Sequence, residues 1–193
     1  MDSQIAEIRE KHIPAERLQL RIDAEESARI RLQTFLAAPT LENLSSFLVE
    51  VDYDRNKSGK KVQDRFGLSF RGKNGNGLLS HIPVVADWIR QLWEVPEEDC
   101  PELMAQLLKD DAVPGAGPAF VSLIPYLRNP EVFTLWLGSM VKGLELVDGK
   151  SYQGRSADAY RTYNAAANDF RNRNRLEPQT MDIVLVVLNE AQG

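Results

Sequence analysis

Residues 15–38 read AERLQLRIDAEESARIRLQTFLAA, and this stretch decides the fold class. Ala, Leu, Glu, Arg and Gln lose little conformational freedom in a helix, and Pro39 prevents the helix from continuing. Thr40 is a good N-cap for a second helix, whose apolar residues share one face: Leu41, Leu44, Phe47, Leu48 and Val51. The N-terminal part of the chain therefore predicts packed helices.

Most of the remaining chain has the same helical character. The predicted helices cover residues 80–93, 100–109, 118–127, 131–144, 156–171 and 180–190. The last segment, TMDIVLVVLNE, would also suit a buried strand, but no partner strand is evident nearby. Residues 55–77 lack helical periodicity and contain five glycines, which predicts a loop or one β-hairpin with anchors at Val62, Phe66, Leu68 and Phe70.

We therefore expect a mainly α, compact multi-helix domain over residues 1–193. Its parts are N-terminal helices in 1–54, the basic Gly-rich loop or hairpin in 55–77, and a helical part in 78–193 with a hairpin at 113–120. The chain is 43% hydrophobic and 26% charged, as in a packed globular protein. No apolar signal segment follows Met1, and the longest apolar run is far too short to cross a membrane, so we expect a cytoplasmic protein.

Positive charge is concentrated in two short stretches, although the formal net charge is −5. Residues 55–73 carry 7 basic and 1 acidic group, and residues 155–175 carry 5 and 2. Together the two stretches hold 12 of the 23 basic residues. A local basic patch attracts phosphate groups even on an acidic protein, because salt screens charges beyond about 8 Å. The pattern therefore favours nucleic-acid binding, with two solvated loops as the alternative.

The sequence lacks the usual catalytic and cofactor motifs. GKNGNG at 72–77 has the glycine spacing of a phosphate loop, but Leu78–Leu79 stand where Lys and Ser or Thr are required. His12 and His81 have no carboxylate or cysteine at ligand spacing. The single cysteine, Cys100, follows three acidic residues that disfavour its thiolate. We therefore expect no cofactor, no metal and no catalytic residue.

One enzymatic alternative stays open. The tripeptide Asp148-Gly149-Lys150 resembles the acid-x-lysine end of restriction nuclease sites, in which carboxylates hold Mg²⁺ and the lysine stabilises developing charge. A second acidic ligand would come from Asp110, Asp111 or Glu131, none of which has a defining context. Asp-Gly is also a common turn dipeptide, which is the competing interpretation.

The segment VPGAGPAF, residues 113–120, lies between two predicted helices and resembles the hairpin of a helix-hairpin-helix motif. Gly115 and Gly117 leave no side chain between the backbone and a phosphate, and N–H groups at the start of the following helix point towards an anion. Such a site holds the DNA backbone without reading its sequence. The alternative is a tight turn that only packs against its neighbours.

Residues 100–190 also resemble a known family. The run LLKDDAVPGAGPAFVSLIPYLRNPEVFTLWLGSMVKGL and the closing MDIVLVVL are similar to regions found ahead of the motor in McrB-like restriction ATPases. The resemblance implies a non-catalytic target-recognition module of a restriction or defence system, which binds duplex or single-stranded DNA for an AAA+ motor domain or subunit. This chain itself contains no Walker motif.

On this interpretation three groups of residues contact DNA. Gly115 and Gly117 hold a phosphate. The first basic stretch follows the backbone through Arg55, Lys57, Lys60, Lys61, Arg71 and Lys73. The second combines phosphate contacts with base stacking through Arg155, Arg161, Arg171, Arg173, Arg175, Tyr152, Tyr160 and Tyr163. The alternative for this last group is a solvated arginine face over half-buried tyrosines. The competing function is a helical protein–protein adaptor, which does not explain the clustered basic residues.

Overall fold

The computed structural model describes residues 2–52, 68, 73–110 and 112–191. These residues form ten helices and no named strand, which confirms the mainly α class. The helices are α1 (Asp2–His12), α2 (Ala15–Ala37), α3 (Leu41–Val51), α4 (Lys73–Ser80), α5 (Ile82–Glu94), α6 (Cys100–Asp110), α7 (Pro118–Arg128), α8 (Gly138–Asp148), α9 (Ala157–Arg173) and α10 (Pro178–Glu190). Within the described ranges, no helix combines the length and apolar content that a membrane crossing requires.

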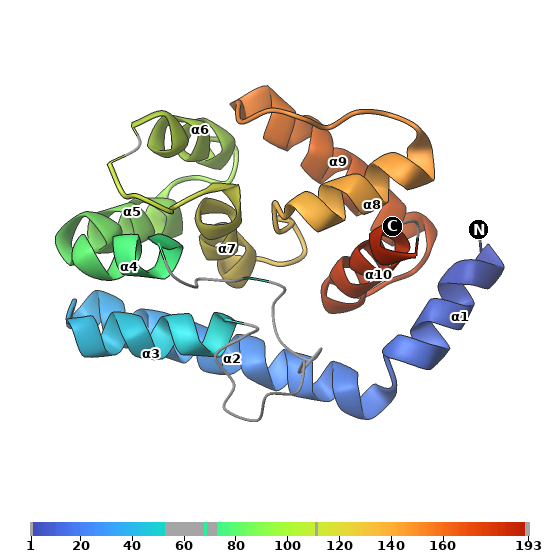
Figure 1. Ribbon diagram of the computed structural model, residues 1–193, viewed down its shortest axis with the longest axis horizontal. Coiled ribbons are helices and arrows are strands. Elements are labelled where there is room, and N and C mark those ends of the chain that lie inside the picture. The colour runs from blue at the N-terminus through green and yellow to red at the C-terminus, as the bar shows by residue number, and fades with distance from the viewer. Residues whose placement is uncertain (1, 53–67, 69–72, 111, 192–193) are drawn as a thin grey trace.

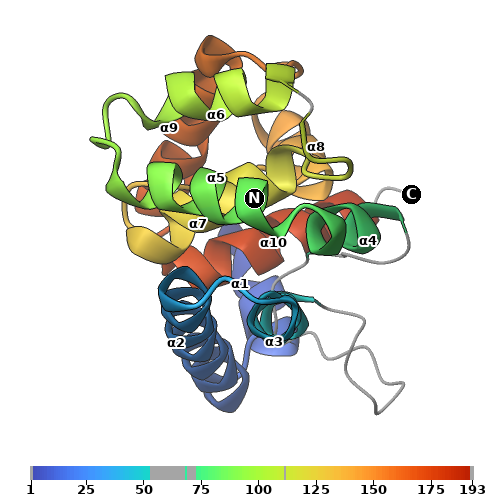
Figure 2. The same ribbon diagram turned by 90° about the vertical axis from the view of Figure 1, so that its left-hand side faces the viewer.

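Helices α2 and α3 form a lower layer beneath most of the other helices (Figures 1 and 2). The two helices pack against each other after a short turn, in which Thr40 Oγ1 accepts a hydrogen bond from Asn43 N–H at 3.2 Å. Thr40 is thus confirmed as an N-cap, and α2 ends at Ala37, just before Pro39. Across the layers, α2 contacts α5, α7 and α10, and α1 contacts α10.

Helix α4 replaces part of a predicted loop. The prediction of a loop or hairpin over 55–77 is wrong for residues 73–77, which form the start of α4. The other predicted strand anchors lie outside the described residues, apart from Leu68, which is buried and pairs with Asp52 through an isolated bridge. Gly77 brings α4 against the turn after α6, since a Cβ atom there would lie 1.7 Å from the Pro114 carbonyl oxygen.

Helices α8, α9 and α10 occupy the right-hand part of Figure 1. Ser156 Oγ accepts a hydrogen bond from Ala159 N–H at 3.1 Å and caps α9. The ambiguous segment 180–190 lies in α10, so the helix prediction for it is confirmed. Helices α8 and α10 approach closely at Gly143, where an added Cβ atom would lie 2.0 Å from the Leu185 carbonyl oxygen.

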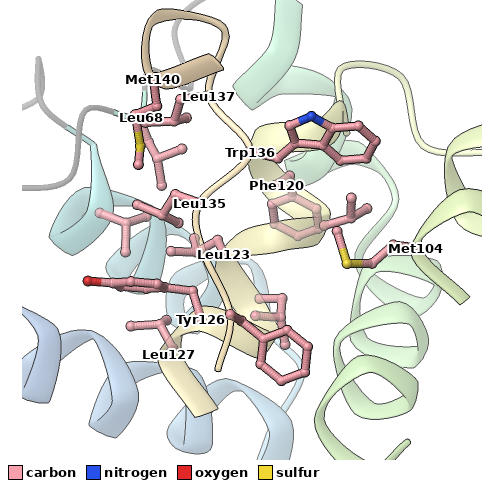
Figure 3. Packing of buried hydrophobic residues seen from close by; sticks show 14 of the residues in the cluster. Leu68, Met104, Phe120, Leu123, Tyr126, Leu127, Leu135, Trp136, Leu137 and Met140 are labelled. Carbon is pink, nitrogen blue, oxygen red and sulfur yellow. The ribbon is translucent and has the colours of Figure 1, made fainter. Parts of the chain in front are cut away.

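Residues 130–137 are not helical, so the predicted helix from residue 131 is wrong up to α8. This segment passes through the core, and Figure 3 shows Leu135 and Trp136 among the α7 side chains. Side chains form hydrogen bonds with its backbone in place of helical hydrogen bonds. Two backbone N–H groups donate to side chains: Thr134 N–H to Asn164 Oδ1 (2.8 Å) and Trp136 N–H to Ser122 Oγ (2.8 Å). Two backbone carbonyls accept from tyrosines: Thr134 O from Tyr160 O–H (3.0 Å) and Leu135 O from Tyr163 O–H (2.8 Å). A buried backbone group without a partner would cost about 1–3 kcal/mol.

A buried ionic cluster joins α2 to α7 and α10. Arg21 donates to Glu25 Oε1 at 3.0 Å and to Asp182 Oδ2 at 2.6 Å, so two carboxylates share one guanidinium. Tyr126 O–H and Gln179 Nε2 also donate to Glu25, at 2.6 and 2.7 Å. Burial raises the pKa of Asp182 to about 6, because the loss of water and the nearby Glu25 charge outweigh the attraction of Arg21.

Candidate anion-binding site

Residues 113–117 form a tight turn between α6 and α7, and two of its N–H groups bond within the turn rather than staying free for an anion. Ala116 N–H donates to Val113 O at 3.1 Å, and Gly117 N–H donates to Gly115 O at 3.0 Å. Gly115 has a φ of 85°, in the left-handed region that favours glycine. The turn reverses the chain tightly enough for α6 and α7 to pack against each other.

The start of α7 has no side-chain cap. Gly117 occupies the N-cap position and has no side chain to accept from the first turn, and Pro118 lacks an N–H group. A Cβ atom built on Gly117 would meet no atom within 4 Å, so the backbone is approachable at this point. The N-terminus of a helix carries about half a positive charge, which makes it attractive to anions.

A pocket of about 180 Å³ lies at this helix start. Three segments enclose it: the start of α7, the start of α8, which also has no side-chain cap, and the loop between α8 and α9. Its lining residues are Pro118, Trp136, Gly138, Val141, Lys142, Tyr152, Gln153, Gly154 and Arg155. The fold therefore brings Pro118, directly after the predicted turn, to the same pocket as Tyr152 and Arg155, whereas Gly115 and Gly117 are not among the lining residues.

Two exposed cationic side chains, Lys142 and Arg155, line the pocket. Within the described residues, neither side chain has an ion pair with a carboxylate. Gly154 has a φ of 130°, and a Cβ atom on it would lie 3.1 Å from the Ala159 Cβ atom. Only glycine suits this conformation, so Gly154 sets the course of the chain that places Arg155 at the pocket.

Tyr152 forms a fixed wall of the pocket. It is 4% exposed, its hydroxyl donates to Asp148 Oδ2, and its ring meets the Tyr163 ring edge-on with 6.3 Å between centroids. Burial and the Asp148 hydrogen bond raise the pKa of Tyr152 to about 12, so it stays neutral at physiological pH. Its ring is held too firmly for the open stacking platform that the sequence suggested.

Other arginines of the 155–175 stretch are neutralised by carboxylates. The pairs are Arg161 with Glu102, Arg171 with Glu131 at 3.2 Å, and Arg173 with Asp169 at 3.0 Å. Arg171 is also buried and donates to the carbonyl oxygens of Pro130 and Glu131, so it supports the 130–137 segment. Arg175 is exposed and lies outside the pocket lining.

Tyr160 and Tyr163 correct the stacking prediction. Their exposed fractions are 1% and 0%, and their hydroxyls donate to the backbone of the 130–137 segment. As placed, neither ring presents a face to a base. The tyrosines of this stretch are more deeply buried than even the half-buried alternative allowed.

Most of the first basic stretch falls outside the described residues. Its residues Arg55, Lys57, Lys60, Lys61 and Arg71 lie outside the described part of the chain. Lys73 begins α4.

Sequence reasoning missed Lys142, Trp136 and Gly138 as pocket residues. The prediction of a helix over 131–144 placed the helix start too early. It therefore missed that α8 begins at Gly138 and that Lys142 lies one turn after this start. The available signal was Gly138, which follows the β-branched and aromatic run at 132–137, because a glycine can end an extended segment.

Asp148 and Lys150 end α8 in a turn. Asp148 Oδ1 accepts from Lys150 N–H at 3.0 Å, Oδ2 accepts from Tyr152 O–H, and Gly149 has a φ of 71° as the C-cap. Among the residues that the structure describes, no group of three or more potential metal ligands gathers. The hydrogen bonds and the C-cap show that this Asp-Gly forms a turn.

No protein-family model, curated protein or solved structure matches this chain. The resemblance of residues 100–190 to McrB-like N-terminal regions therefore stays a prediction.

Proposed function

We propose that this chain is a non-catalytic DNA-binding module that holds phosphate groups at the pocket beside the 113–117 turn. One observation carries the proposal. The starts of α7 and α8, which have no side-chain cap, lie at the same pocket as Lys142 and Arg155, two cations that have no ion pair among the described residues. Helix starts attract phosphates, and Lys and Arg contacts to phosphate supply most non-specific DNA affinity. Since phosphates carry no base identity, binding with little sequence preference is expected.

The proposed cellular role is target recognition beside an AAA+ motor domain or subunit of a restriction or defence system. Its support is the resemblance of residues 100–190 to the regions ahead of McrB-like motors. The pocket supplies the DNA contact that such a role requires, and the chain supplies no nucleotide-hydrolysing motif of its own.

Fluorescence anisotropy tests the proposal with labelled duplex and single-stranded DNA, with and without methylated cytosine, at about 50 and about 200 mM salt. The test variant combines Lys142→Gln with Arg155→Gln. The control is Arg31→Gln, which also removes an exposed positive charge, but on α2. Unfolding curves of all variants confirm that they fold.

Wild type should bind with an affinity that falls steeply as salt rises. Removing one cation that neutralises a phosphate lowers the slope of log affinity against log salt by about 0.9. The double variant should therefore show a shallower slope and the control an unchanged one. No binding of wild type at low salt would refute the proposal and favour the adaptor function. Equal slopes for wild type and the double variant would show that the pocket is not the phosphate site.

A further inference from the structure

We infer that the pocket selects a terminal phosphate, the phosphomonoester at a strand end or on a free nucleotide, over an internal phosphodiester. This inference rests on the proposed function, because it concerns the same pocket, and it names the kind of phosphate that the pocket takes. Its support comes from the size of the pocket, its charge and its hydrogen-bond donors.

The pocket is small and bounded by three segments of the chain. Its volume of about 180 Å³ is below the range of about 300–1,000 Å³ that is typical of sites enclosing whole small-molecule ligands. A single group such as a phosphate suits this volume.

The charge of the pocket matches a dianion. Lys142 and Arg155 carry two positive charges that no described carboxylate neutralises, and the two uncapped helix starts add partial positive charge. A phosphomonoester carries a charge of about −1.5 to −2 at pH 7 and offers three strong acceptor oxygens. An internal phosphodiester carries about one negative charge. Two carboxylates lie next to the pocket wall. Asp148 is engaged through both oxygens by Lys150 and Tyr152, and Glu145 accepts from Tyr152 N–H and Gln153 Nε2 at 2.8 Å each.

Arg155 supplies directed hydrogen-bond donors to the pocket. Its exposed guanidinium can take two phosphate oxygens in its fork geometry. Trp136 also lines the pocket, is 5% exposed, and donates its backbone N–H to Ser122 Oγ.

The test compares single-stranded DNA probes that carry either a 5′-phosphate or a 5′-hydroxyl, with the fluorophore at the 3′ end. A slightly longer 5′-hydroxyl probe controls for total charge. Unlabelled nucleoside 5′-monophosphate and inorganic phosphate serve as competitors, and calorimetry measures their direct binding. The variants are Arg155→Gln, Gly138→Leu and the control Arg31→Gln. Gly138 lines the pocket and a Cβ atom on it meets no atom within 4 Å, so leucine fills the pocket without moving the backbone.

The 5′-phosphorylated probe should bind wild type at least about tenfold more tightly than either 5′-hydroxyl probe, the usual effect of one charge-assisted hydrogen bond or more. The preference should vanish in Arg155→Gln and in Gly138→Leu and persist in Arg31→Gln. If the mononucleotide competes with an affinity equal to that of the 5′-phosphorylated probe, the phosphate alone accounts for the preference. If it competes more weakly, the rest of the strand adds contacts. Both results support the inference.

Equal, salt-sensitive affinity for all three probes overturns the inference and leaves the proposed DNA binding intact. Binding of the mononucleotide without binding of any DNA probe supports the phosphate pocket and overturns the DNA-binding proposal. Absence of binding to DNA, mononucleotide and inorganic phosphate overturns both.

Discussion

Replacing Asp182 with Asn should make the protein relatively more stable as the pH rises. Asp182 is 4% exposed, shares Arg21 with Glu25, and has its pKa raised by burial from 3.8 to about 6. Between those two pH values the folded state binds a proton more tightly than the unfolded state does. Unfolding then releases this proton, so the contribution of Asp182 to the free energy of unfolding falls as the pH rises through this window.

The size of the effect follows from the shift in pKa. A change from 3.8 to about 6 is about 2 pKa units, and each unit corresponds to about 1.36 kcal/mol, so wild type loses up to about 3 kcal/mol between pH 4 and pH 7. The Asp182→Asn variant has no proton to exchange at this position. Its free energy of unfolding minus that of wild type should therefore increase by up to about 3 kcal/mol over the same range, out of a total stability of about 5–15 kcal/mol.

Urea unfolding followed by tryptophan fluorescence, at several pH values from about 4 to about 7, measures this difference. Titrating groups away from the Arg21 cluster contribute equally to both proteins and cancel in it. The control is Asp158→Asn, which also replaces a carboxylate, but one whose side chain is 95% exposed and lies outside the buried cluster. A difference for Asp182→Asn that stays constant, or that falls as the pH rises, would refute the reasoning. A fall would mean that attraction to Arg21 outweighs burial and lowers the pKa of Asp182.

Further predictions concern packing, backbone satisfaction and the cysteine. Gly143→Ala should destabilise the fold by about 1–3 kcal/mol in urea unfolding, because the added Cβ atom would lie 2.0 Å from the Leu185 carbonyl oxygen. The control is Gly138→Ala in the same helix, which should have little effect because its Cβ atom would meet no atom within 4 Å. Equal losses of stability in the two variants would contradict the close crossing of α8 and α10. Asn164→Ala should cost about 1–3 kcal/mol, since it leaves the Thr134 N–H without its side-chain partner, whereas Val132 O keeps its hydrogen bond from Asn168; an unchanged urea midpoint would argue against that role. Cys100 is buried, and burial raises its pKa to about 11. Maleimide labelling of this thiol at about pH 7.5 should therefore be slow in the folded protein and faster when urea unfolds it. Fast labelling of the folded protein would show that the thiol is accessible.

Local chemistry explains why helix limits could be predicted well. Pro39 cannot continue a helix, Thr40 and Ser156 satisfy N–H groups of the turn that follows them, and Gly117-Pro118 starts α7 as expected. Each of these effects acts within about one helical turn, so it is visible in the sequence alone.

The 130–137 segment is the counterexample. Its composition allows a helix, and its non-helical form depends on hydrogen bonds with the side chains of Tyr160, Tyr163 and Asn164 on α9 and of Ser122 on α7. Since these partners are distant in the sequence, the pattern could not reveal them. The same contacts explain why two tyrosines that resembled stacking groups belong to the core.

The sequence by itself determined the helical class, most helix limits, the α6–α7 turn and the regional concentration of basic residues. Only the tertiary structure decided which cations keep their charge uncompensated. Arg161 meets Glu102 and is neutralised, whereas Arg155 reaches a pocket with Lys142 and meets no described carboxylate. The physical reason is that ion pairing depends on distance through space, over a few ångströms, and the folded chain sets those distances between residues that are far apart in sequence.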